Sequence, residues 1–188
     1  MEHFYRGPEF GEDFFTYPKF YSSIVEHFPS GSHFVEVGSW KGKSAAYMAV
    51  EIINSGKDIK FDCVDTWTGS EEHVGVKEVV EGTLYETFLK NTVPVRHIIN
   101  PVRMDSVAAA AMYPDASLDF VFIDGDHSYE GVRRDILAYL PKMKINSILS
   151  GHDYAWHEPI QRAVKELFGP DYKYDDSFGN GCWVVRCA

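Results

Sequence analysis

The feature that most restricts the fold is a short apolar run that ends in an acid, within residues 118–135, LDFVFIDGDHSYEGVRRD. The four residues before Asp124 are apolar, and apolar residues at helical spacing begin near Tyr129. A short apolar run followed by a polar turn and a helix predicts a buried strand of a parallel sheet. Ligands of open α/β sheets bind just outside the carboxyl ends of such strands. Asp124, Asp126 and His127 therefore mark a candidate site.

Strands and helices alternate along the rest of the chain. We expect strands at residues 33–37, 60–64, 95–99, 120–123, 147–149, 172–177 and 182–187. We expect helices at residues 17–28, 44–54, 77–90, 106–112, 129–140 and 158–168. This order predicts an α/β fold with a Rossmann-like, doubly wound sheet of seven strands, mostly parallel, with an antiparallel hairpin at one edge.

The length of 188 residues fits one domain, in which residues 1–30 form an arm and a leading helix and residues 31–188 form the core. Residues 1–16 are rich in aromatic side chains, so we expect this arm to pack against the domain, the substrate entrance or a partner subunit. A homodimer is one expectation that follows.

Composition excludes several classes of protein. The net charge of −10 argues against binding a nucleic-acid backbone. The three cysteines are too few for a disulfide framework. No apolar run approaches the ~18 residues of a membrane span, and no cationic and then apolar leader is evident. We therefore expect a cytoplasmic protein that neither crosses a membrane nor binds nucleic acid.

Residues 34–44, FVEVGSWKGKS, predict a strand, a turn and the start of a helix, where backbone N–H groups can bind a ligand. A dinucleotide loop, GxGxxG, needs glycine where this chain has Trp40 and Lys43. A P-loop, GxxxxGK[ST], needs one residue more than this turn has. Because the strand before Asp124 resembles the magnesium-binding strand of P-loop NTPases, an NTPase stays an alternative.

A third ligand, S-adenosylmethionine, fits the same turn. Backbone amides would bind its carboxylate, and Glu36 is placed to meet its ammonium group. Asp65 follows Gly42 by 23 residues, close to the ~20-residue offset of ribose-binding acids. Asp105 and Ser106 follow the third strand, where the adenine amino group would lie. These positions agree with one cofactor.

Four segments, FVEVGSWKGKSA, DCVDTWTGSEEHVG, FVFIDGDHSYEGVRRDI and GHDY, together resemble class I S-adenosylmethionine-dependent methyltransferases. The chain looks most similar to the branch with macrocin- and mycinamicin-type sugar O-methyltransferases and cephalosporin hydroxylase-like proteins. The resemblance covers about residues 33–154. The chain departs from the antibiotic-modifying members because it lacks their long N-terminal domain and insertions.

The resemblance implies a role for each matching residue. Cofactor contacts are expected from Glu36, Gly38, Ser39, Ser44, Asp65, Thr66, Trp67, Asp105, Ser106 and Asp124. Asp124 and Asp153 would hold Mg²⁺, and His127 would be the catalytic base beside Asp124. The substrate would contact His73, His152 and Tyr154. The implied reaction is magnesium-assisted methylation of a hydroxyl on a sugar or another small molecule.

Structural roles stand beside these expectations. Asp124 can organise a turn or cap the next helix, Asp126 is expected to be a turn or cap residue, and His127 can be a structural histidine. The cysteine spacing disfavours zinc, and the cofactor loop argues against an iron site of His127, His152 and an aspartate. A non-catalytic binding module with a cofactor-type fold is a further alternative.

Overall fold

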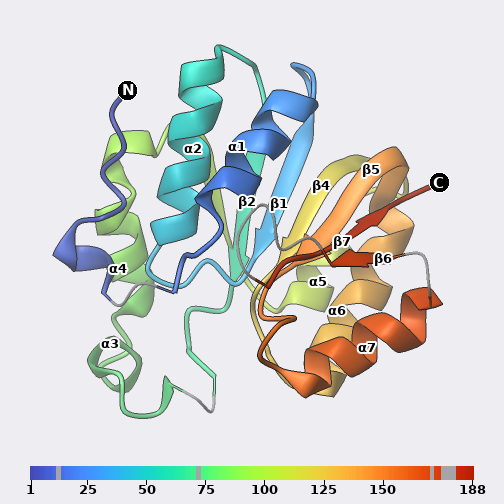
Figure 1. The fold of residues 1–188 in the computed structure, drawn as a ribbon. Helices are drawn as coiled ribbons and strands as arrows, with labels where there is room; N and C mark the ends of the chain where they lie inside the picture. Colours follow the sequence, from blue (N-terminus) through green and yellow to red (C-terminus); the bar gives the residue numbers. More distant parts are fainter. Residues whose placement is uncertain (12–13, 71–72, 170–171, 175–180) are drawn as a thin grey trace.

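The computed structural model describes residues 1–11, 14–70, 73–169, 172–174 and 181–188, without the side chains of 172–174. Its sheet has the strand order β3-β2-β1-β4-β5-β7-β6 (Figure 1). The strands are β1 (His33–Val37), β2 (Lys60–Asp65), β3 (Ile99–Arg103), β4 (Leu118–Ile123), β5 (Met143–Gly151), β6 (Tyr172–Tyr174) and β7 (Trp183–Arg186).

The sheet is mostly parallel. β1 pairs with β2 and β4, β2 with β3, and β4 with β5, all in parallel. β7 runs antiparallel to both β5 and β6. The expected α/β, Rossmann-like architecture is therefore confirmed, while the connection predicted between the last two strands, residues 175–180, lies outside the described part of the chain.

Helices cover both faces of the sheet because β-strand side chains alternate in direction. α1 (Pro18–His27) and α2 (Lys43–Ser55) pack on one face (Figure 1). Their core includes Phe34 and Phe120 of the sheet. The alternate residues of the same strands, Val35 and Val121, belong to the second core. That core is covered by α5 (Ser106–Ala110), α6 (Tyr129–Tyr139) and α7 (Glu158–Phe168).

Two expected elements are wrong. The helix expected at residues 77–90 is broken into α3 (Lys77–Val80) and α4 (Leu84–Asn91), because Gly82 takes a left-handed φ of 68° between them. The strand expected at 95–99 begins only at Ile99, since Val93–Val95 forms a 3₁₀ turn with a proline at its start. β3 lies at the sheet edge, where Pro101 is tolerated.

The N-terminal arm packs on its own domain. Tyr5, Phe10 and Phe15 are buried in the same core as α1 and α2. Pro8–Phe10 forms a 3₁₀ turn, and the leading helix α1 starts at Pro18, a residue suited to the first helical turn. Among the described residues, no helix has the length and apolar character needed to cross a membrane.

Candidate active site

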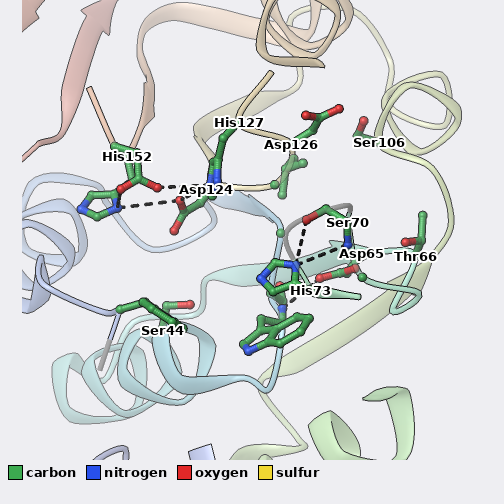
Figure 2. Close-up of a pocket in the computed structure, with 18 of the residues that line it drawn as sticks. Ser44, Asp65, Thr66, Ser70, His73, Ser106, Asp124, Asp126, His127 and His152 are labelled. Carbon is green, nitrogen blue, oxygen red and sulfur yellow. Dashed lines mark hydrogen bonds and ion pairs between the residues drawn. The ribbon is translucent and has the colours of Figure 1, made fainter. Parts of the chain in front are cut away.

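A pocket of about 1480 Å³ opens at the carboxyl ends of the parallel strands. Its lining comes from the ends of β1, β2, β4 and β5, from the start of α2 and from the N-terminal arm (Figure 2). Pockets for one small molecule usually occupy roughly 300–1,000 Å³, so this one has room for a cofactor and a second ligand. Polar and aromatic side chains both contribute to its wall.

The turn after β1 is held tightly against the turn after β4. Gly38 has a φ of 90°, and a β-carbon there would collide with the backbone carbonyl of Asp124. Gly42 has a φ of 86° and precedes the first residue of α2, Lys43. Both glycines are therefore required by local geometry: Gly38 lets the loop approach the acid at the end of β4, and Gly42 packs against Thr92 and Phe88.

Asp65 at the end of β2 organises this loop through backbone amides. Its Oδ2 accepts the N–H of Trp40 at 2.9 Å, and its Oδ1 accepts the N–H of Trp67 at 2.7 Å. Both tryptophans have positive φ, 46° and 52°, which bulky residues rarely adopt. Burial raises the pKa of Asp65, although these N–H donors oppose the shift. The carboxylate thus holds two strained backbone positions.

Glu36 lies in β1, two residues before Gly38; it is almost fully buried and is not part of the pocket wall. Its Oε2 accepts the hydroxyl of Tyr21 at 2.7 Å. Burial raises the pKa of Glu36 to about 7, even though the hydroxyl groups of Tyr21, Ser39 and Ser44 lower it. Among the described residues, Glu36 Oε1 and Ser39 Oγ are buried without a hydrogen-bond partner. Such orphaned acceptors fit the ammonium and amino-acid end of S-adenosylmethionine.

The adenine side of the predicted cofactor site is a small polar network. Asp105 accepts the backbone N–H groups of Val107 and Ala108 and caps α5. Ser106 donates its hydroxyl to Asp135 Oδ1 at 2.5 Å. Burial raises the pKa of Asp135 to about 6, against the lowering effect of Ser106. Ser106, whose hydroxyl proton is already bound, presents an acceptor to the pocket.

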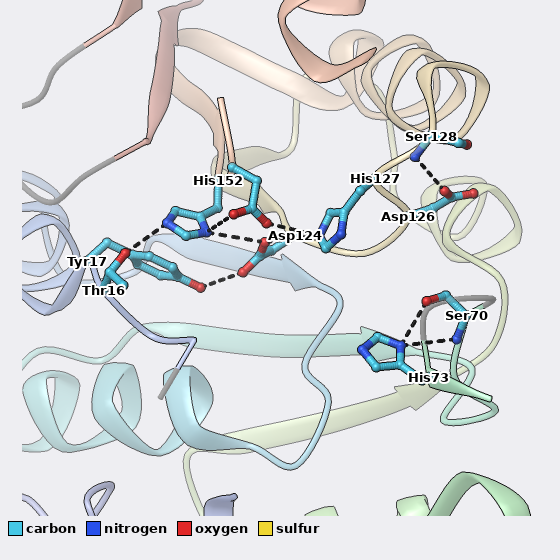
Figure 3. Close-up of polar contacts among 10 residues, drawn as sticks. Thr16, Tyr17, Ser70, His73, Asp124, Asp126, His127, Ser128 and His152 are labelled. Carbon is cyan, nitrogen blue, oxygen red and sulfur yellow. Dashed lines mark hydrogen bonds and ion pairs between the residues drawn. The ribbon is translucent and has the colours of Figure 1, made fainter. Parts of the chain in front are cut away.

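A histidine and aspartate cluster lies at the ends of β4 and β5 (Figure 3). Asp153 lies between two imidazoles: its Oδ2 is 3.1 Å from His127 Nε2, and its Oδ1 is 3.2 Å from His152 Nδ1. Asp124 Oδ1 lies 3.9 Å and 3.8 Å from the same two nitrogens. Burial raises the pKa of Asp153, but His152, His127 and His157 outweigh it and hold that pKa below its usual value.

Two residues of the N-terminal segment support this cluster. Tyr17 donates its hydroxyl to Asp124 Oδ2 at 2.7 Å, and Thr16 Oγ1 lies 3.0 Å from His152 Nε2 (Figure 3). Burial, followed by the charge of Asp124, raises the pKa of Tyr17 well above its usual value, so it stays a donor. Sequence reasoning missed both residues; the aromatic character of the arm was the only signal.

Asp124 and Asp126 have separate roles. Ser128 caps α6, so Asp124 is not its cap, and Asp124 instead accepts Tyr17. Asp126 accepts the backbone N–H of Ser128 at 2.8 Å, which is the expected turn role. His157, which looks like a surface residue in the sequence, lines the pocket 5.2 Å from His127 between ring centroids.

Three other predicted residues differ in their surroundings. His73 lines the pocket, stacks on Trp40 at 4.1 Å and pairs with Ser70.

Trp67 was expected near the adenine, but it is only 2% exposed and packs in the apolar core. Tyr154 was expected to contact substrate, but it is buried in the second core. Neither Trp67 nor Tyr154 is part of the pocket wall, so we correct both expectations to packing roles. Ser44 and Thr66 do line the pocket.

Comparison with known proteins identifies the family. A model described as a methyltransferase domain matches residues 35–154, which is more than half of the chain. The chain belongs to the methyltransferase domain family. It is a class I S-adenosylmethionine-dependent methyltransferase. A search among curated proteins finds no match.

Solved structures share the fold. The O-methyltransferase NovP matches with a TM-score of 0.69 at 16% identity, over 91% of this chain and 79% of NovP. Cofactor-bound Rv0187 from MTB matches with a TM-score of 0.60 at 16% identity, over 91% and 80%. A Clostridium thermocellum protein described as an rRNA methylase matches with a TM-score of 0.58 at 13% identity, over 88% and 94%. Identities this low establish the fold and leave the acceptor open.

The NTPase alternative is wrong. The family match assigns the loop to a methyltransferase domain. The physical reason is that the Trp40 N–H is taken by the Asp65 carboxylate, whereas a P-loop directs successive N–H groups at phosphate. Aspartates 65, 105, 124, 126, 135 and 153 also line the pocket, and they would repel a polyphosphate.

Proposed function

We propose that this methyltransferase methylates a hydroxyl group of a small molecule, such as a sugar with two adjacent hydroxyls. The observation that carries the proposal is the pair of His127 Nε2 and Asp153 Oδ2, 3.1 Å apart, in the wall of the same pocket as the cofactor loop. An alcohol must lose its proton as it attacks the methyl group, and an imidazole oriented by a carboxylate is suited to accept it.

The residues of this chain would divide the work as follows. Glu36 and Ser39 would bind the methionine end of the cofactor, while Asp65 and Ser106 would contact the ribose and adenine. Ser39, Asp65 and Ser106 line the pocket, and Glu36 is buried outside its wall. Asp153 accepts the Nε2–H of His127 and orients the ring, so His127 takes the proton of the acceptor hydroxyl at its other ring nitrogen, Nδ1. The apolar arm and loop residues exclude water, so that acceptor and methyl group stay aligned.

Asp124 and Asp153 would also hold a divalent cation, for which the sequence predicts Mg²⁺. Both carboxylates offer oxygen ligands, and the Asp153 pKa is held low, which keeps that group ionised. S-adenosylmethionine supplies the methyl group, and a bound cation lowers the pKa of a coordinated hydroxyl. The acid-lined pocket and the net charge of −10 favour a small neutral or cationic acceptor over a nucleic acid.

Exposed aromatic side chains at the pocket support an acceptor with an apolar ring face. Phe14 and Trp156 both line the pocket and are 63% and 56% exposed. Large aromatic faces that remain accessible in a pocket can stack on sugar or aromatic rings.

The test combines cofactor binding and turnover. Titration calorimetry with S-adenosylhomocysteine should give a stoichiometric complex, and a panel of sugars and diols should include one that yields S-adenosylhomocysteine from S-adenosylmethionine. If the cofactor binds but only nitrogen or carbon acceptors are methylated, hydroxyl methylation is refuted. Turnover that survives EDTA unchanged would refute the role of the cation.

A further inference from the structure

The cluster at the ends of β4 and β5 offers one nitrogen ligand that an all-oxygen magnesium site would lack. Asp124, His152 and Asp153 each provide one ligand atom, and these three atoms lie within 4.8 Å of one another. His152 Nδ1 is 3.2 Å from Asp153 Oδ1 and 3.8 Å from Asp124 Oδ1. Atoms that each lie roughly 2.0–2.2 Å from one ion are separated by roughly 3–3.6 Å. The observed separations are close to that range.

The three groups are also held in the orientation that a shared ion requires. His152 is 5% exposed, and its Nε2 lies 3.0 Å from Thr16 Oγ1, so Nδ1 faces the carboxylates. Tyr17 holds Asp124 Oδ2 at 2.7 Å, which leaves Oδ1 toward the cluster. Metal-bound histidines almost always bond their second ring nitrogen to a neighbouring polar group, and ligating carboxylates are likewise hydrogen-bonded.

The backbone at Asp153 takes an uncommon conformation. Asp153 has a φ of 59°, a left-handed conformation that costs a non-glycine residue free energy. The Asp153 carboxylate lies between His152 and His127. Strain of this kind is retained where the surrounding structure fixes the residue, and it gathers at functional sites.

The donor set decides which ion fits. Mg²⁺ prefers oxygen ligands and keeps much of its water, whereas imidazole nitrogen suits first-row transition ions. We propose that Asp124, His152 and Asp153 bind a divalent transition ion, with Mn²⁺ and Co²⁺ as probes, more tightly than Mg²⁺. This inference rests on the proposed function only in assigning His127 to proton transfer and not to the ion.

The test measures metal binding directly on the full chain, freed of metal by chelation. Calorimetry should give a Co²⁺ affinity at least about tenfold above that for Mg²⁺. Pulsed electron paramagnetic resonance of bound Mn²⁺ should show coupling to an imidazole nitrogen, and His152→Ala should abolish it. Mg²⁺ binding as tight as Co²⁺ binding, or no nitrogen coupling from bound Mn²⁺, would overturn the proposal.

Supporting variants separate ligation from folding. Thr16→Val and Tyr17→Phe keep the side-chain shape and should weaken Mn²⁺ binding roughly 10- to 100-fold. The matched control is His97→Ala at an exposed histidine beside the start of β3, which should change nothing. If His157→Ala removes the nitrogen coupling and His152→Ala does not, the ion lies in the other candidate group and the assignment fails. Metal binding without hydroxyl methylation would refute only the proposed function.

Discussion

The two halves of the pocket are held in different ways. At the ends of β1 and β2 the backbone itself forms the site, through Gly38, Gly42 and amides bound to Asp65. At the ends of β4 and β5 side chains form it, through Asp153 and its two histidines. A site formed by the backbone tolerates substitution at few positions, but its shape depends little on the ionisation of side chains. A cluster of side chains depends on their charges and on the neighbouring groups that hydrogen-bond to them.

The largest effect is expected in the side-chain half. His127→Ala should lower kcat roughly 10²- to 10⁴-fold, because a positioned general base typically contributes that much. The affinity for S-adenosylhomocysteine should stay within about twofold, since His127 belongs to the acceptor side. Steady-state kinetics and calorimetry on the same preparations check both numbers, with His97→Ala as the control. An equal loss of turnover and cofactor affinity would make His127 structural.

In the half of the pocket that the backbone forms, Gly38 should be the position most sensitive to substitution. Gly38→Ala forces a β-carbon into the Asp124 carbonyl at a φ of 90°, so we expect a loss of at least about 2 kcal/mol in the free energy of unfolding. Cofactor binding should fall with it, because the loop must move away from β4. Gly56→Ala is the matched control: φ is 67° there, but open space surrounds the site. It should cost only about 1 kcal/mol in denaturant unfolding. Equal losses would remove the contact with Asp124 as the cause.

Glu36 combines features of both halves, because it is an ionisable side chain next to the loop that the backbone forms. Its pKa of about 7 in the fold lies above the ordinary 4.5. The carboxylate therefore destabilises the fold as pH rises from about 4.5 to 7, by at most about 3 kcal/mol above pH 7. Glu36→Gln should raise the free energy of unfolding by up to that amount at pH 8.5 and less at pH 5.5.

The same variant should bind S-adenosylhomocysteine about tenfold more weakly at pH 7.5, because an uncharged amide no longer neutralises the ammonium. Denaturant unfolding at the two pH values measures stability, with exposed Glu26→Gln expected within about 0.5 kcal/mol of the parent. A stability gain independent of pH would mean that the buried charge is not its origin.

The sequence predicted most of the fold because the apolar runs are local. β1 and α7 match their expected bounds, and β4 ends at Ile123, one residue before the acid that marks the site. The errors arose where two signals compete. The apolar residues Val95, Ile98 and Ile99 suggest a strand, but Val95 is the last residue of a 3₁₀ turn with a proline at its start, and the strand begins only at Ile99. The real edge strand contains Pro101, which argues against a strand in sequence reasoning.

The candidate site was predictable only in part, because the sequence reveals local patterns but not contacts between distant residues. Acids at strand ends follow from the local pattern, which is why Asp65, Asp124 and Asp153 were predicted to be site residues, and all three line the pocket. Tyr17 and Thr16 reach residues 107 and 136 positions away in the chain, and no periodicity reveals such contacts. The sequence also did not decide whether Trp67 is buried, because an aromatic residue after a strand can pack in the core or contact a cofactor.

The smallest expected effect concerns the selectivity of the cofactor site for adenine. Ser106 donates its proton to Asp135, so the Ser106 oxygen can only accept from the pocket side. Adenine has an amino donor at that edge, whereas hypoxanthine has a carbonyl acceptor. S-adenosylhomocysteine should therefore bind more tightly than its inosine analogue by about 1 kcal/mol, the net contribution of one hydrogen bond.

Two variants distinguish orientation from mere packing. Ser106→Ala should remove the preference for adenine. Asp135→Asn can turn its amide N–H toward Ser106, which frees the Ser106 proton for the pocket and should shift the preference toward the inosine analogue. Calorimetry with both ligands measures the ratio of Kd values, a quantity that a general loss of stability leaves unchanged. If both variants weaken the binding of the two ligands equally, Asp135 has only a structural role. The preference for adenine then arises from other residues of the cofactor site.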